Sequence, residues 1–264
     1  MKRIVLAGAL VTAFAAGLVA QPTTAQPPAA GAPAQAPKGP SPDEVKALQA
    51  VMAASQGGDF DGVIKAAEDV VTRFPDSTYK DMVLSAESDA YKGKRDWIKA
   101  QIYAEQALAA NPKSYQANLQ LSDLLAQHTG EHDLDKEEKL TKADKYAHQA
   151  LDLLATAPKP QPNLPDAQWD GYKQALTAQA QHDLALSAMS RKKWDDAIAA
   201  FKAAIAIDPQ PAYKVQMASA LQSQGKNDEA IALCDEVLAM PQLHPAIQAA
   251  AKNIKEVATK AKGK

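Results

Sequence analysis

The sequence has little of what several common classes of protein require. Its one cysteine, Cys234, excludes an internal disulfide and leaves too few thiolates for a structural zinc site. Aromatic residues make up only 5% of the chain, and the net charge of −2 gives no electrostatic reason to bind nucleic acid. The chain has instead 56 alanines among 264 residues, and 46% of its residues are hydrophobic. Because alanine favours helices over strands, this composition predicts an all-α protein.

The N-terminal segment predicts export. Met1-Lys2-Arg3 is positively charged, and residues 4–20 are uninterruptedly apolar. We interpret residues 1–25 as a signal peptide, with an uncleaved membrane anchor as the alternative. In both cases the remaining chain is expected outside the cytoplasm, in the periplasm or extracellular space of a bacterial envelope. No cysteine directly follows the apolar segment, so a lipoprotein is not expected.

Two proline-rich segments divide the rest of the chain. Residues 26–42 are rich in proline and alanine and have no large apolar side chain, which predicts a disordered tether. Residues 158–165 contain four prolines and must interrupt any helix. They are expected to separate a first helical half, 43–157, from a second half, 166–244.

Between these segments the sequence repeats itself. Segments beginning at Phe60, Trp97 and Trp194 each have a small apolar residue three positions later and a proline fifteen positions later. A fourth copy begins at Asn227, lacks the aromatic residue and keeps the spacing to within one position. The small residues are Val63, Ala100, Ala197 and Ala230, and the prolines are Pro75, Pro112, Pro209 and Pro241. Further apolar residues follow each small residue at helical spacing, which predicts a helix that ends before each proline.

This pattern resembles the tetratricopeptide repeat, a unit of about 34 residues that forms two antiparallel helices. The clear units lie near 44–77, 81–114, 178–210 and 211–244, and a degenerate copy lies between the second and third of them, with an expanded turn near 128–139. The resemblance implies an α-solenoid of about five helix hairpins: three in the first half and two in the second. Residues 245–264 are expected to add a capping helix and a basic tail, with its lysines facing solvent.

The resemblance also implies where a partner binds, because tetratricopeptide stacks generally use the inner face of their first helices. That face is predicted to include Ser85, Asp89, Lys92, Gln116, Asp123, Gln179, His182, Ser219 and Gln222. It lacks the paired lysines and asparagines with which some members of the family bind a C-terminal carboxylate. Trp169 and Tyr172 lie outside the repeat frame and are expected either to cover the interface between the halves or to form an exposed aromatic contact.

The strongest indication of catalysis is the segment from His128 to His132, which matches the H-x-x-E-H pattern of some zinc peptidases. That chemistry needs both imidazoles on one helix face, whereas Gly130 interrupts this segment within the expanded turn. A solvated loop is therefore favoured, and a zinc-dependent hydrolase, with His148 as a third ligand, is the remote alternative. Cys234 stands at a core position of the repeat, where a buried, inert thiol is expected.

These observations predict a non-catalytic interaction module or scaffold of the cell envelope that binds a protein or peptide. We expect it to use no cofactor, to bind no nucleic acid and not to insert into the membrane once the signal peptide is removed. The alternative is a periplasmic factor that assembles or coordinates envelope or outer-membrane machinery.

Overall fold

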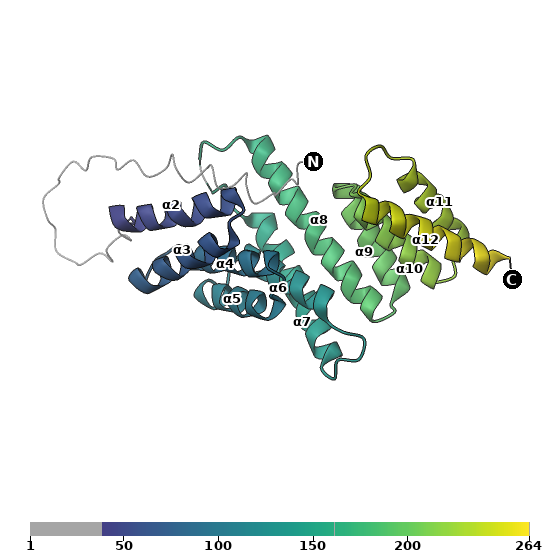
Figure 1. Ribbon diagram of the computed structural model, residues 1–264, viewed down its shortest axis with the longest axis horizontal. Coiled ribbons are helices and arrows are strands. Elements are labelled where there is room, and N and C mark those ends of the chain that lie inside the picture. The colour runs from purple at the N-terminus through teal and green to yellow at the C-terminus, as the bar shows by residue number, and fades with distance from the viewer. Residues whose placement is uncertain (1–38, 161, 264) are drawn as a thin grey trace, which may run out of the picture. The chain divides into compact units, whose positions relative to one another are not determined.

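The computed structural model describes residues 39–160 and 162–263. The predicted signal peptide and nearly all of the predicted tether lie outside these residues. Within them the chain forms helices and no strand, which confirms the all-α prediction (Figure 1). The helices are α2 (Pro42–Gly57), α3 (Phe60–Arg73), α4 (Lys80–Gly93), α5 (Trp97–Ala110), α6 (Tyr115–His128), α7 (Lys136–Thr156), α8 (Asp166–Ser190), α9 (Trp194–Ile207), α10 (Pro211–Ser223), α11 (Asn227–Leu238) and α12 (Pro245–Lys262). None of these described helices is both long and apolar enough to cross a bilayer.

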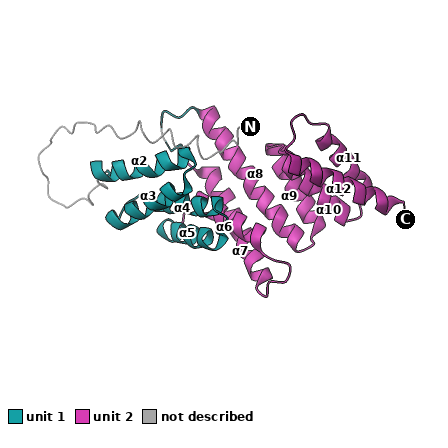
Figure 2. Cartoon of the chain, in the orientation of Figure 1, with its two compact units in different colours: residues 1–111, 158–165 teal, residues 112–157, 166–264 magenta. Residues whose placement is uncertain are grey.

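The helices form two compact units (Figure 2). The first unit contains α2 to α5 together with the proline-rich segment 158–165, and the second contains α6 to α12. The change of unit falls between Asn111 and Pro112, where the second repeat ends. The proline-rich segment 158–165 would instead group α6 and α7 with the first half, whereas in the structure α7 packs against α8 within the second unit.

The same turn closes four of the hairpins. In each of these turns, the residue two positions before the second helix has a left-handed backbone. These residues are Gly58 (φ 68°), Arg95 (62°), Lys192 (60°) and Gly225 (86°). The next residue donates its N–H to a carbonyl in the last turn of the first helix: Asp59 to Ala54, Asp96 to Tyr91, Lys193 to Ala188, and Lys226 to Leu221. This bond satisfies a carbonyl that the helix end would leave without a partner, so the turn fixes where each second helix begins.

Small side chains let the two helices of a hairpin approach closely in the first unit. In α5, Ala100, Ala104 and Ala107 are fully buried, as the repeat register predicts. The Ser88 hydroxyl on α4 donates a 2.7 Å hydrogen bond to the Ala100 carbonyl on α5. A larger side chain at position 88 or 100 would separate the helices, so these residues determine the spacing within the hairpin.

The core of the second unit combines alanines with a few large side chains. Phe201 on α9 is fully buried among apolar residues of α8, α10 and α11. The last helix, α12, buries Ala251 and Ala258 on the preceding pair and so covers the end of the stack. This confirms the predicted capping helix.

Two elements of the second unit are longer than the repeat requires. The expanded turn predicted at 128–139 is divided between a loop, residues 129–135, and the first residues of the 21-residue α7. Helix α8 has 25 residues and begins well before the repeat frame. Its first turns bury Trp169, which stacks on Tyr172 at 5.8 Å, and the Tyr172 hydroxyl accepts a hydrogen bond from Gln116 of α6. The two aromatic residues therefore pack α8 towards α6.

Candidate partner-binding surface

The first helices of the hairpins in the second unit, α6, α8 and α10, place polar side chains near one another. Buried polar residues are frequent on α6, where Asp123 is 4% exposed and accepts a hydrogen bond from the Gln127 amide. On α8, the neighbouring residues His182 and Asp183 are 9% and 1% exposed. Burial of so many polar groups is costly unless they interact with one another or with a ligand.

His182 joins α8 to α10. Its Nε2 donates a 2.7 Å hydrogen bond to Gln216 Oε1, and its ring stacks on Tyr213 with centroids 4.5 Å apart. On the other side, Nδ1 lies 3.6 Å from the carboxylate of Asp183. Phe201 lies beneath the imidazole, with ring centroids 6.0 Å apart. The imidazole is thus held in one orientation at the junction of two repeats.

The Tyr213 hydroxyl lies in a partly buried environment with carboxylates nearby. Burial raises the pKa of its hydroxyl to about 12, and the negative charges of Asp208, Asp183 and Asp123 contribute to this rise. The phenol is therefore neutral over the physiological range and remains a hydrogen-bond donor. We call Asp123, His182, Asp183, Tyr213 and Gln216 the inner cluster.

The structure brings together only some of the predicted site residues. Asp123 and His182 belong to the inner cluster. Gln116 lies near the start of α6 and contacts Tyr172 instead. Gln179, Ser219 and Gln222 are half-buried on α8 and α10. Their role in binding stays a prediction.

The three predicted residues of the first unit lie on α4 and differ from one another. Ser85 is buried, Lys92 is half-buried and Asp89 is exposed. Ser85 therefore has little surface to offer a partner. Asp89 and Lys92 stay as candidates on this helix.

Another polar group of the first unit lies where α3, α4 and α5 meet. Glu87 of α4 is 1% exposed, and the side chain of Tyr103 on α5 interacts with it. The Tyr103 ring stacks on Tyr91 at 5.1 Å, and the Lys99 ammonium lies 5.0 Å from the Tyr91 ring centre. Burial and the nearby charge of Glu68 raise the pKa of Glu87 to about 7. Two stacked rings thus fill the space between these helices.

The H-x-x-E-H segment does not have the geometry of a metal centre. His128 ends α6, whereas Glu131 and His132 lie in the loop that follows. Hydrogen bonds from Lys136 and Lys192 lower the pKa of Glu131 to about 2, which makes it a poor general base. Nowhere in residues 39–160 and 162–263 do three His, Cys, Asp or Glu side chains group closely enough to hold a metal ion.

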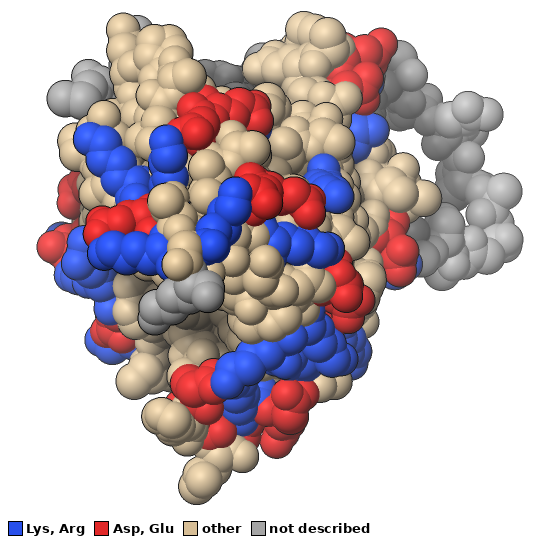
Figure 3. Space-filling model, turned by 90° about the vertical axis from the view of Figure 1, so that its right-hand side faces the viewer, with Lys and Arg blue, Asp and Glu red and all other residues tan. Residues whose placement is uncertain are grey.

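The lysines of α12 mostly have acidic neighbours. Lys255 pairs with Asp235 at 2.5 Å, Lys260 with Glu256 at 2.5 Å, and Lys262 with Asp228. On the face shown in Figure 3, Lys and Arg side chains likewise lie beside Asp and Glu side chains. A basic patch that would attract an acidic surface is therefore not formed by these three lysines.

Several residues of the inner cluster are absent from the sequence-based prediction. The repeat register for partner binding selects only some positions of each first helix, and Asp183, Tyr213 and Gln216 are not among them. A helical projection of α10 gives the missing signal, since Tyr213 and Gln216 are three positions apart and share a face.

The fold defines the class: an α-solenoid built from helix hairpins. Residues 178–211 match the Tetratricopeptide repeat family, and these residues form the second half of α8 and all of α9. The chain therefore contains a tetratricopeptide repeat, and the five hairpins of the described residues, with the register-defined alanines in their core, have the fold of tetratricopeptide-repeat proteins. Proteins of this class are generally non-catalytic scaffolds that bind other proteins.

Comparison with solved structures supports the fold. The chain is similar to TTC0263, a thermophilic TPR protein of Thermus thermophilus, with a TM-score of 0.53 and 16% identity over 80% of this chain and 98% of that chain. It is also similar to the MamA protein, with a TM-score of 0.53 and 18% identity over 76% of this chain and 96% of that chain. No curated protein matches the sequence. These identities are low, so the likeness bears on the fold alone.

Proposed function

We propose that this protein is a non-catalytic interaction module of the bacterial cell envelope. The proposed export rests on the charged and apolar N-terminal sequence, and the proline-rich segment after it would give the repeats reach. The module would bind a protein or peptide segment on the first helices of the second unit.

The inner cluster is the observation that carries this proposal. Its residues lie on three consecutive first helices, and His182 links α8 to α10 and has little freedom to move because it is held by Gln216, Tyr213 and Phe201. The accessible part of the inner cluster is formed by the half-buried Tyr213 and Gln216, and the buried Asp123, His182 and Asp183 support them from beneath. This arrangement is preorganised, so a partner would lose its own freedom on binding without also having to order the site. Neutral donors beside carboxylates are suited to hydrogen bonds with an extended peptide.

Site-specific photo-crosslinking in intact cells tests the proposal. A photoreactive side chain at position 179 or 219, next to the inner cluster, should give the same protein adduct. The matched control is position 202, where Lys202 is exposed on the second helix α9. Tyr213→Ala should weaken the adduct from position 179 about tenfold, which corresponds to the loss of one well-packed aromatic anchor. Equal adducts from positions 179 and 202, or an adduct unaffected by Tyr213→Ala, would contradict the proposal.

The location needs a separate measurement. The mass of the purified protein should correspond to a chain that begins after residue 20 or 25, and cell fractionation should recover it outside the cytoplasm. A full-length chain in the cytoplasmic fraction would exclude export, whatever the crosslinking shows.

A further inference from the structure

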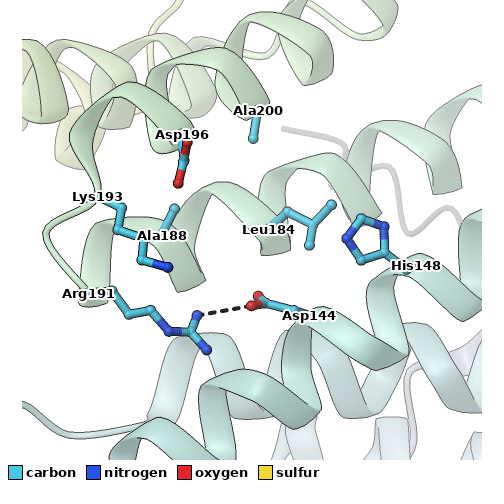
Figure 4. A pocket seen from close by; sticks show the side chains of 8 residues that line it. All are labelled: Asp144, His148, Leu184, Ala188, Arg191, Lys193, Asp196 and Ala200. Carbon is cyan, nitrogen blue, oxygen red and sulfur yellow. Dashed lines mark ion pairs between the residues drawn. The ribbon is translucent and has the colours of Figure 1, made fainter.

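The second unit contains a cavity that the inner cluster does not use. It lies between α7, α8 and α9, on the second-helix side of the hairpins, and has a volume of about 250 Å³ (Figure 4). Leu184 and Ala188 of α8 and Ala200 of α9 provide its apolar lining. Asp144, His148, Arg191, Lys193 and Asp196 provide its polar lining.

The repeat register explains why this space is empty. Aligning Trp97 with Trp194 places Tyr91 opposite Ala188 and Tyr103 opposite Ala200. In the first unit these two tyrosines form the stacked pair between α4 and α5. In the second unit both rings are replaced by methyl groups, so the corresponding space has lost its aromatic filling.

The same register extends to the other walls of the cavity. Glu87 corresponds to Leu184, and Glu68 of α3 corresponds to His148 of α7, when Ala67 is aligned with Ala147. In the first unit, Glu87 interacts with both Tyr103 and Glu68, so the two tyrosines occupy the space bounded by these positions. The first unit therefore shows that this part of the repeat accommodates tyrosine side chains.

We propose that the cavity binds the side chain of a tyrosine in an extended segment of a protein partner. Its volume is below the range of about 300–1,000 Å³ that encloses drug-sized ligands, which favours a single inserted side chain. A flat ring matches the space that Tyr91 and Tyr103 fill in the first unit. The polar lining suits a ring that ends in a hydroxyl, since an entirely apolar group could not hydrogen-bond with the polar groups that it would cover.

The cationic residues add complementarity to an aromatic ring. Arg191 is held by Asp144 at 3.0 Å and by Glu137 at 2.9 Å, so its guanidinium stays at the edge of the cavity. The Lys193 side chain extends towards Ala188 (Figure 4). A ring above Ala188 would then lie beside an ammonium group, as Tyr91 lies beside Lys99 in the first unit. Cations near a ring face are attracted to its negative quadrupole.

This inference rests on the proposed function, since it supplies a partner contact, but it concerns different residues. The inner cluster belongs to α6, α8 and α10, whereas the cavity lies among α7, α8 and α9. The two sites can therefore be tested independently.

Binding of p-cresol, the side-chain analogue of tyrosine, tests the inference directly. With alanine methyl groups labelled in the full chain, p-cresol should cause saturable NMR shifts at Ala188 and Ala200. Ala232 on α11, which is exposed and outside the cavity, is the internal control. N-acetyl-tyrosinamide should shift the same methyl groups, which distinguishes a peptide residue from a free phenol. Absence of saturable shifts, or equal affinity for toluene or methylcyclohexane, would overturn the inference.

Filling the cavity gives the second test. Ala188→Tyr restores the residue that the first unit has at this position, and it should weaken p-cresol binding at least about tenfold. If Ala188→Tyr fails to fold, Ala200→Leu is the second variant; it fills less of the space and should also weaken p-cresol binding. Ala199→Tyr, at an exposed position of α9, is the matched control and should leave binding unchanged. Unchanged binding in a folded Ala188→Tyr or Ala200→Leu variant would overturn the inference, even if crosslinking at the inner cluster succeeds.

Discussion

The side chain of Tyr103 on α5 interacts with the buried side chain of Glu87 on α4. Both residues lie within the first unit, in a hairpin whose second helix, α5, buries only alanines. A carboxyl group that is 1% exposed is expensive to ionise. Its burial and the neighbouring Glu68 together outweigh the hydrogen bond from Tyr103, and the pKa rises to about 7.

This raised pKa makes the stability of the first unit depend on pH. The folded-state pKa of about 7 lies above the ordinary value of 4.5, so the folded state binds the proton more tightly than the unfolded state. The contribution to stability is therefore fully present below pH 4.5 and is lost as the pH rises through 7. We expect the free energy of unfolding to fall by on the order of 2 kcal/mol between these pH values, as measured by urea unfolding.

Glu87→Gln is the matched control for that titration. The amide keeps the shape and the acceptor for Tyr103 but has no charge to bury. The variant should be more stable than the parent at pH 8 and should lose most of the slope between pH 4.5 and 7. A slope that persists in Glu87→Gln would assign the pH dependence to another group.

The left-handed turns predict a stabilising substitution. Arg95 has φ 62°, a backbone conformation that disfavours residues with a Cβ, whereas the equivalent Gly58 and Gly225 adopt it without this strain. Arg95→Gly should raise the free energy of unfolding by about 0.5–1 kcal/mol, measured by urea unfolding at pH 5. Lys94→Gly is the control, because Lys94 is right-handed with φ −79° and gains nothing from glycine. Destabilisation by both variants would contradict this account of the turn.

The arrangement of hairpins could be predicted from the sequence because each repeat carries the same local information. Ala100, Ala197 and Ala230 mark the close helix contact, and all three are fully buried. The proline that follows each second helix marks its end. Such signals depend on residues within one repeat, so they do not require knowledge of the rest of the chain.

Features that join different repeats could not be predicted in the same way. His182 and Tyr213 are 4.5 Å apart in space but belong to separate hairpins, and neither repeat alone indicates the other. The boundary between the units at Pro112 is not evident from the sequence, because the strongest break, 158–165, does not separate α7 from α8, which both belong to the second unit. The cavity can be recognised only by comparing two repeats. Ala188 alone is an ordinary core alanine, and only its alignment with Tyr91 indicates that a large side chain is missing.

The interactions of Arg191 are predicted to stabilise the packing of α7 against α8. Its guanidinium bonds to Glu137, Asp144 and Ser187, and its side chain is 9% exposed. The ammonium of lysine cannot reproduce the planar, multidentate arrangement. Arg191→Lys should therefore lower the free energy of unfolding by about 1–3 kcal/mol. Lys192→Ala removes an exposed ion pair to Glu131 and should change it by less than about 1 kcal/mol. Equal losses of unfolding free energy in Arg191→Lys and Lys192→Ala, measured by urea unfolding, would show that the buried interactions of Arg191 contribute no more to stability than an exposed ion pair.

Cys234 predicts a thiol that reacts only when the chain opens. It is fully buried on α11, and burial followed by the charge of Asp235 raises its pKa. Since the thiolate is the reactive form, Ellman's reagent at pH 8 should label the folded protein slowly, at a rate that rises with added urea. Ala232→Cys in a Cys234→Ala background places a thiol at an exposed position of the same helix, and it should react within the mixing time. Rapid labelling of Cys234 in the folded protein would exclude an inert core thiol.

His182 allows stability and partner binding to be separated. His182→Phe keeps an aromatic ring to stack on Tyr213 and to pack near Phe201, but it removes the hydrogen bond to Gln216. The variant should unfold with a free energy within about 1–2 kcal/mol of the parent, because one buried hydrogen bond is lost while the ring packing remains. If the inner cluster binds the partner, the photo-crosslink from position 179 should fall more than this loss of stability explains, since the protein is still folded. Gln222→Ala, at a half-buried position towards the end of α10, is the control for a small change on a neighbouring surface. A full-strength crosslink in folded His182→Phe would show that the imidazole organises the repeat junction and takes no part in recognition.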